Sequence, residues 1–488
     1  MKRWEKAGVE AGIPGYLTVY AALTLAVMIS LCMVLIEGVR RNTIAFETEC
    51  VMDIGMDSVL AEYHREMLKR YGLFMIDTSY GTEYPSFYNT EQHLAAYLSR
   101  NLSYEDCHQL SFLYRDLLGM RLEDVQILRV SLATDDGGRA FQHRAVEHMQ
   151  SRLGLEAVVK LLEWTETAEG YGILEQNIEE QLDQVGAELR QYDGKERQIG
   201  EEEWVKIRIT DPTQAVQQLR REGILKWVVE DVSTLSTATI DLEQYISRRA
   251  ERGEINHGSD WEQEELNIVD NIFLLEYFMT YSGRYGAPLE DSLLQYQTEY
   301  LLCGNAADMD NLNQAVSLLC GIREAANVIY LLGDGTKRGE AETLAAVLSG
   351  AIAMPELEPL FETALILTWA YLESLYDVRT LLAGGRIELL KTDENWHYSL
   401  ENIWNPQIEE QKADASGLSY EDYLRILLYM QSPDILTMRF MDLVEMDIRR
   451  TVGNQYFRMD GCIDALEAEA QIRSGYGYQF TIRRDKKY

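Results

Sequence analysis

The longest apolar stretch of the chain lies close to its N-terminus. Residues 16–36 contain no charged side chain, and as an α-helix rising ~1.5 Å per residue they span about 31 Å, the thickness of the hydrocarbon core of a bilayer. A cleaved signal peptide has a shorter apolar region, ~7–15 residues, that ends at a small-x-small site, whereas here Glu37-Gly38-Val39-Arg40-Arg41 follows directly. The pattern predicts an uncleaved transmembrane helix over residues 15–36.

Basic residues on both sides of this stretch set its expected orientation. The stretch is preceded by three of them and followed by two, which are Lys2, Arg3, Lys6, Arg40 and Arg41. Because positive residues stay on the cytoplasmic side, residues 1–14 are expected to form a cytoplasmic leader. We therefore expect a single-pass protein of the cell membrane, with the lipid bilayer as a partner and the main domain outside the cytoplasm.

The helical pattern does not stop at the membrane. Apolar residues recur at spacings of three and four from Met52 to Tyr71, which is typical of an amphipathic helix. The pattern predicts one helix from Gly15 to about Tyr71, or two helices with a bend near Gly38 or Gly55, because glycine costs about 1 kcal/mol relative to alanine inside a helix. Either arrangement joins the anchor directly to the folded domain.

Residues 37–163 read as a membrane-proximal part that mixes helices and strands. A short strand is expected near residues 73–76 and a helix near 91–102. A half-buried strand follows, because Val125, Ile127, Val130 and Leu132 alternate with polar neighbours.

An acidic helical insertion is expected over residues 164–256. Its first part, 164–204, holds twelve acidic and three basic residues but keeps an apolar stripe at helical spacing, from Leu174 to Leu189. We interpret this part as a protruding amphipathic hairpin.

Residues 257–446 form the expected helical core. Uncharged runs there, such as 343–354 and 363–372, are far shorter than the ~20 residues of a membrane span, so they predict buried helices. Ser419, with Asp422 three residues later, predicts a capped helix start. Residues 447–488 read as three short strands of an antiparallel sheet. The predicted fold class is α+β and mainly helical.

Charge removes one class of partner. The chain of 488 residues has 45 Lys and Arg against 80 Asp and Glu, a net charge of −35. A dense negative field repels phosphate groups. We expect no nucleic-acid partner.

Motifs for catalysis, cofactors or metals are not found in the sequence. His143 and His148 are five residues apart, whereas the helix of a zinc protease places its two ligands four apart. We therefore assign no catalytic, cofactor-binding or metal-binding residue. The charges that interrupt the apolar helices, among them Arg323, Glu324 and Asp377, are interpreted as structural ion pairs.

The cysteines do not form a scaffold of disulfides. Five lie outside the predicted membrane helix, and none has C-x-x-C spacing. One bridge between Cys303 and Cys320 is an alternative to free buried thiols, which we favour.

Four blocks of sequence, residues 15–81, 298–332, 367–396 and 472–484, resemble an uncharacterised family of single-pass membrane-anchored bacterial proteins. That family is associated with Tad-type pilus loci, and its N-terminus is similar to TadE-like pseudopilins. The resemblance implies a prepilin-peptidase site between Gly15 and Tyr16. Pseudopilins carry Glu at the fifth position after the cleavage site, and here that position is Tyr20, so the chain departs from the pilin pattern.

These observations lead to one expected function and two alternatives. We expect a structural or accessory protein of the cell envelope, pseudopilin-like, whose partners are other membrane proteins of a pilus or secretion apparatus. The first alternative is a membrane-tethered enzyme or ligand sensor with a site among Glu324, Glu373, Asp377 and Arg379. The second is an adhesin that binds through the acidic hairpin.

Overall fold

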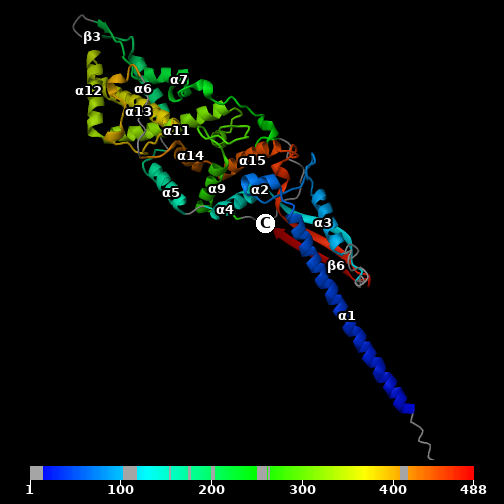
Figure 1. Ribbon diagram of the computed structural model, residues 1–488. Helices are drawn as coiled ribbons and strands as arrows, with labels where there is room; N and C mark the ends of the chain where they lie inside the picture. Colours follow the sequence, from blue (N-terminus) through cyan, green and yellow to red (C-terminus); the bar gives the residue numbers. More distant parts are fainter. Residues whose placement is uncertain are drawn as a thin grey trace, which may run out of the picture.

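A computed structural model describes residues 15–102, 118–152, 155–173, 177–198, 204–249, 261, 264–406 and 416–488. The molecule is elongated, with helix α1 projecting from one end of the folded body (Figure 1). A small antiparallel sheet lies next to the base of α1, and the helical core extends away from it. The predicted fold class, α+β and mainly helical, is confirmed.

Helix α1 (Gly15–Leu60) has two halves with different surroundings. The side chains of residues 16–39 are exposed, whereas Ile44, Met52 and Met56 are fully buried. The buried half packs against α3 (Phe87–Leu102) and strand β6 (Gln479–Lys487). The helix continues through Gly38 and Gly55, so neither glycine ends it.

The expectation of one helix as far as Tyr71 is wrong, because α1 ends at Leu60 and a separate helix, α2, covers Arg65–Tyr71. His64 makes the break. Its backbone N–H donates to the carbonyl of Met75 at 2.8 Å, and its imidazole accepts from the backbone N–H of Met67 at 3.2 Å, which caps α2. A bond to a residue just beyond α2 therefore takes the place of the next turn of α1.

Strand β5 (Cys462–Arg473) is the centre of the sheet. It pairs antiparallel with β2 (Arg121–Leu132) along one edge, and with β1 (Ile76–Asp77) and β6 along the other. The alternation predicted for β2 is confirmed, since its four apolar side chains are buried. The sequence predicts three C-terminal strands after residue 447, but the structure has two, because the first two predicted strands form the single continuous strand β5. Two of its acidic residues are paired from neighbouring elements, Asp464 with Arg144 and Glu467 with Arg129.

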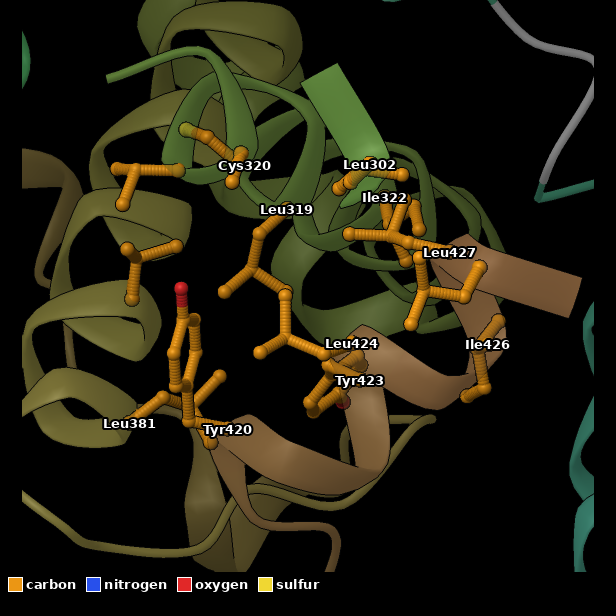
Figure 2. Close-up of a cluster of buried hydrophobic side chains, with 14 of the residues drawn as sticks. Leu302, Leu319, Cys320, Ile322, Leu381, Tyr420, Tyr423, Leu424, Ile426 and Leu427 are labelled. Carbon is orange, nitrogen blue, oxygen red and sulfur yellow. The ribbon is translucent and has the colours of Figure 1, made fainter. Parts of the chain in front are cut away.

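The helical core is built around two long helices, α11 (Asp308–Gly333) and α13 (Glu358–Leu382), which pack against each other. Figure 2 shows the part of this core where Leu319 and Ile322 of α11 lie beside Leu424 and Leu427 of α14 (Tyr420–Tyr429). The predicted capping box of Ser419 and Asp422 starts α14. The other helices are α4 (Arg139–Gln150), α9 (Ile268–Tyr281), α10 (Gln297–Cys303), α12 (Gly335–Ala351) and α15 (Pro433–Arg449).

Helix α5 (Leu155–Gly170) crosses the predicted start of the acidic segment at residue 164. The segment then forms α6 (Ile178–Tyr192), α7 (Thr213–Glu222), α8 (Leu225–Val228) and the hairpin β3 (Glu196–Gln198) and β4 (Trp204–Lys206). The expected protruding helical hairpin is wrong. Helix α5 packs against α9 and α14, whereas α6 packs its apolar stripe, with Leu182 and Leu189 buried, against α13. The β3–β4 hairpin projects at the end of the body far from α1 (Figure 1).

Candidate functional site

The residues of the predicted anchor lie at the free end of α1. Gly15 is the first residue of the helix, and the side chains of Tyr16 and Tyr20 are 71% and 68% exposed. The apolar residues that follow, as far as Ile36, are exposed as well. Such a helix is long and apolar enough to cross a membrane. Helix α11 is also long and apolar enough to cross a membrane, but most of its apolar stretch is buried in the core. The leader, residues 1–14, lies outside the described residues.

The alternative of a buried catalytic or sensory site rests on four residues. Three of them, Glu373, Asp377 and Arg379, do not form such a site. Glu373 and Asp377, one turn apart on α13, both contact Lys391 at 2.6 Å, and Asp377 also pairs with Arg323 at 3.0 Å. All four side chains of this network are fully buried. Arg379 lies apart from them and donates to the carbonyl of Trp227 at 3.4 Å. We interpret this closely packed network as structural, which is what the interrupting charges predict.

Further hydrogen bonds complete the network. Arg323 donates to the carbonyls of Glu388 and Leu389 at 2.9 and 2.8 Å, and the backbone N–H of Tyr398 donates to Glu373 at 2.7 Å. Burial alone would raise the pKa of Glu373, but His397 and Lys391 outweigh it and lower the pKa. Glu373 is therefore a paired carboxylate and not an acid poised for proton transfer.

Glu324 differs from these residues because it faces a cavity. The cavity has a volume of about 550 Å³ and lies between α6, α7, α11, α13 and α14. We call it the α11 cavity, since one face of α11 forms much of its wall. Its lining includes Glu179, Arg220, Gly321, Glu324, Tyr371 and Leu427.

The charges of the α11 cavity are incompletely paired. Arg220 on α7 lies 3.5 Å from Glu179, 3.8 Å from Asp183 and 3.9 Å from Glu324. Oε1 of Glu324 is buried without a hydrogen-bond partner among the described residues. Burial raises the pKa of Glu324 to about 8, although Arg220 acts to lower it. A carboxyl group so perturbed beside a cavity is a candidate for ligand binding or proton exchange.

The thiol of Cys320 also lines the α11 cavity. Its Sγ lies 3.0 Å from the hydroxyl of Ser374, and burial raises its pKa to about 12. The neutral thiol is a poor nucleophile. Cys303 and Cys320 are both free, as the favoured interpretation predicts. Within the described ranges, no group of three or more His, Cys, Asp and Glu side chains is placed to hold a metal ion.

A comparison with models of protein families matches residues 202–474 to a family of unknown function, DUF5702. The matched residues are more than half of the chain. The chain belongs to the DUF5702 family. The comparisons with curated proteins and with solved structures found no match.

The DUF5702 match divides the candidate sites. It contains Arg220, Glu324 and Tyr371 of the α11 cavity and the whole buried network, whereas Glu179, Asp183 and helix α1 precede it. The cavity is thus built from the DUF5702 segment and completed by α6, which the match does not include.

Two members of these sites were missed by sequence reasoning. The spacing of Glu373 and Asp377 places two carboxylates on one face of an apolar helix, which requires a buried cation, and this signal could have led to Lys391. Arg220 gives no comparable signal, because it lies in the acidic insertion 164–256, and its sequence does not indicate which helix of the core it faces.

Proposed function

We propose that the chain is a single-pass protein of the cell envelope that holds an acidic, mainly helical domain outside the cytoplasm as a structural or accessory part of a membrane assembly. The supporting observation is the continuity of α1, whose exposed apolar half runs without a break into a half packed against the sheet. An exposed, uncharged helix of this length is stable in a bilayer, where its side chains meet lipid tails.

Contacts just after the apolar stretch support a body that sits at the membrane surface. Arg40 stacks over the ring of Tyr476, with 3.9 Å between the guanidinium carbon and the ring centre, and Tyr478 donates to Glu37. Both tyrosines belong to the turn between β5 and β6. Tyrosine is enriched at the interface between membrane and water. This turn therefore suits a position at the outer surface of the bilayer.

Further ion pairs hold the rest of α1 against the sheet. Lys486 contacts Asp57 at 2.5 Å, and Arg484 lies 3.4 Å from Asp53. Because helix and domain are joined by such contacts and not by a flexible linker, a change in the tilt of the membrane helix would move the domain with it. This property suits a component that is positioned by neighbouring membrane helices.

The finer proposal assigns the protein to a Tad-type pilus or secretion apparatus, as a minor pseudopilin-like or accessory component. Its support is the resemblance of the N-terminal block to pseudopilins, together with Gly15 before the apolar stretch. Tyr20 argues against polymerisation, because the glutamate of pseudopilins neutralises the terminal amine of a neighbouring subunit in the apolar filament core. We therefore favour a component that does not polymerise.

The N-terminal residue and the intact mass of protein extracted from its native membrane test this assignment. A chain that begins at Tyr16, and that keeps its full length when Gly15→Leu is introduced, supports recognition by a prepilin-type peptidase. A chain that begins at Met1 in both forms overturns the pseudopilin assignment and leaves a permanent anchor.

A further inference from the structure

The α11 cavity has the size and lining of a site for a small molecule. Its volume of about 550 Å³ lies within the ~300–1,000 Å³ of typical ligand sites. Ile178, Leu318 and Met430 supply apolar surface. A Cβ atom built on Gly321 would meet no atom within 4 Å. The wall formed by α11 is therefore open at this residue, and a side chain placed there would extend into free space.

The polar side of the cavity carries an excess of negative groups. Glu179, Asp183 and Glu324 surround the single guanidinium of Arg220. Their distances of 3.5 to 3.9 Å exceed the ~2.7–2.9 Å of a charge-assisted hydrogen bond. Glu324 is only 3% exposed, and its Oε1 has no hydrogen-bond partner among the described residues. A second cation would satisfy an acceptor that Arg220 leaves free.

We propose that the α11 cavity binds an organic cation, a primary ammonium group on a short apolar chain, with the ammonium group at Glu324 and the chain against the apolar wall. A bare metal ion fits poorly, since apolar side chains line much of the wall and a hard cation needs about six oxygen ligands. An organic anion fits poorly as well, because two carboxyl groups, Glu179 and Glu324, line the cavity against the single guanidinium of Arg220, and Asp183 lies beside that guanidinium.

Binding should depend on pH through Glu324. The pKa of its carboxyl is raised to about 8 by burial, with Arg220 on α7 opposing the shift and Glu179 and Asp183 on α6 adding to it. The other titratable groups that face it are Cys320 on α11 and Tyr371 on α13, both neutral because burial raises their pKa. Helix α14 and the residue that follows it contribute only Leu427 and Met430, which are apolar. The ammonium group requires ionised Glu324, so affinity should rise roughly tenfold per pH unit below 8.

Calorimetric titration of the full chain in lipid nanodiscs tests the proposal, with n-pentylamine as the probe and n-pentanol and pentanoate as matched neutral and anionic probes. We expect saturable binding of one pentylamine per chain at pH 8.5, about tenfold or more weaker binding at pH 6.5, and no saturable binding of the other two. A titration with Nα-acetyl-lysine methylamide shows whether the ammonium group comes from a protein side chain or from a free amine. Its binding indicates the lysine side chain of a partner, and its exclusion indicates a free amine.

Two variants locate the binding. Glu324→Gln should weaken the binding of pentylamine at least tenfold and remove its dependence on pH, and Gly321→Leu should abolish binding by filling the cavity. Glu340→Gln, at an exposed residue of α12, makes the same change of charge elsewhere and should bind like the wild type. If Gly321→Leu fails to fold, Ser317→Leu fills the same wall. The proposal is overturned if pentylamine does not bind, if pentanoate binds in its place, or if Glu324→Gln binds as the wild type does. None of these outcomes depends on whether α1 crosses a membrane.

Discussion

Buried charges are the residues on which the core depends most. Arg323, Asp377, Lys391 and Glu373 are fully enclosed, and each finds a partner of opposite sign at 3.0 Å or less. Removing one member of such a network leaves another charge buried and unpaired, which is more costly than the loss of a surface pair.

Lys391→Met should therefore strongly destabilise the protein. The change leaves Glu373 with only His397, at 3.7 Å, and Asp377 with only Arg323, and we expect a loss of about 3–5 kcal/mol in the free energy of unfolding. Urea titration of the full chain in detergent measures it. Lys226→Met, which removes an exposed lysine paired with Glu222, is the matched control and should change little. Equal effects of the two variants would contradict a structural role for the network.

Glu299 predicts a dependence of stability on pH. Its pKa is raised to about 7 by burial, although Tyr285 and Tyr420 donate to its Oε1. The folded chain thus keeps this proton at a pH where the unfolded chain has lost it. The folded state is penalised increasingly from pH 4.5 to 7, and the penalty is complete above pH 7.

Glu299→Gln should remove this penalty, because an amide stays neutral. Relative to the wild type, the variant should gain up to about 3 kcal/mol between pH 5 and pH 8, as measured by urea unfolding at both values. Glu340→Gln, at an exposed residue of α12, is the matched control. A difference for Glu299→Gln that stays constant between the two pH values would mean that the carboxyl of Glu299 is ionised across the whole range.

The buried charges can be recognised from the sequence, but their partners cannot. Arg323 and Asp377 interrupt apolar helices, which predicts paired ions, and the structure confirms this pair. The same pattern groups Glu324 with them, although Glu324 faces the α11 cavity. Helical spacing places a side chain on a face of its own helix, but which helix covers that face depends on contacts between distant parts of the chain.

At the scale of elements, the crossing of α1 and α3 joins the anchor to the domain. A Cβ atom on Gly55 would lie 2.6 Å from Cδ2 of Leu98 and 3.3 Å from Cδ1 of Leu94. Glycine at this residue therefore lets the two helices approach closely. No such neighbour lies within 4 Å of a Cβ atom built on Gly38.

Gly55→Leu should consequently separate α3 from α1. Overpacking of this kind costs typically about 1–3 kcal/mol, and thermal unfolding of the full chain should show the loss. Gly38→Leu makes the same change on the same helix and should be neutral or slightly stabilising, because leucine is the better helix former. If both variants unfold like the wild type, the close crossing is not present in solution.

The spacing of apolar residues predicts those features of the elements that depend only on the local sequence. The amphipathic half of α1 and the alternation in β2 follow from spacing alone. The end of α1 at Leu60 is accompanied by the bond from His64 to Met75, and β5 is continuous across Asp464 and Glu467, which pair with arginines of other elements. Neither partner can be recognised from the sequence around the element itself.

At the scale of the whole molecule, charge and apolar surface are separated. The exposed apolar side chains of α1 lie at one end, and the rest of a chain with net charge −35 forms the acidic body. An acidic domain is repelled by anionic headgroups. The apolar half of α1 is therefore expected to supply the attachment to the membrane.

Leu25→Arg should weaken that attachment. A charge near the middle of a membrane helix costs about 2.5–3.5 kcal/mol on insertion scales, so a larger fraction of the protein should leave membranes washed with alkaline carbonate. Leu25→Ala keeps the helix uncharged and should stay in the membrane. Complete retention of Leu25→Arg would indicate that another surface holds the protein there.

Protease treatment of intact spheroplasts, followed by mass spectrometry of the membrane fraction, tests the central claim most directly. The proposed single-pass arrangement predicts that the domain is digested from outside, and that a fragment containing residues 15–36 stays in the membrane. Full-length protein that survives in intact spheroplasts and is digested only after lysis would contradict it.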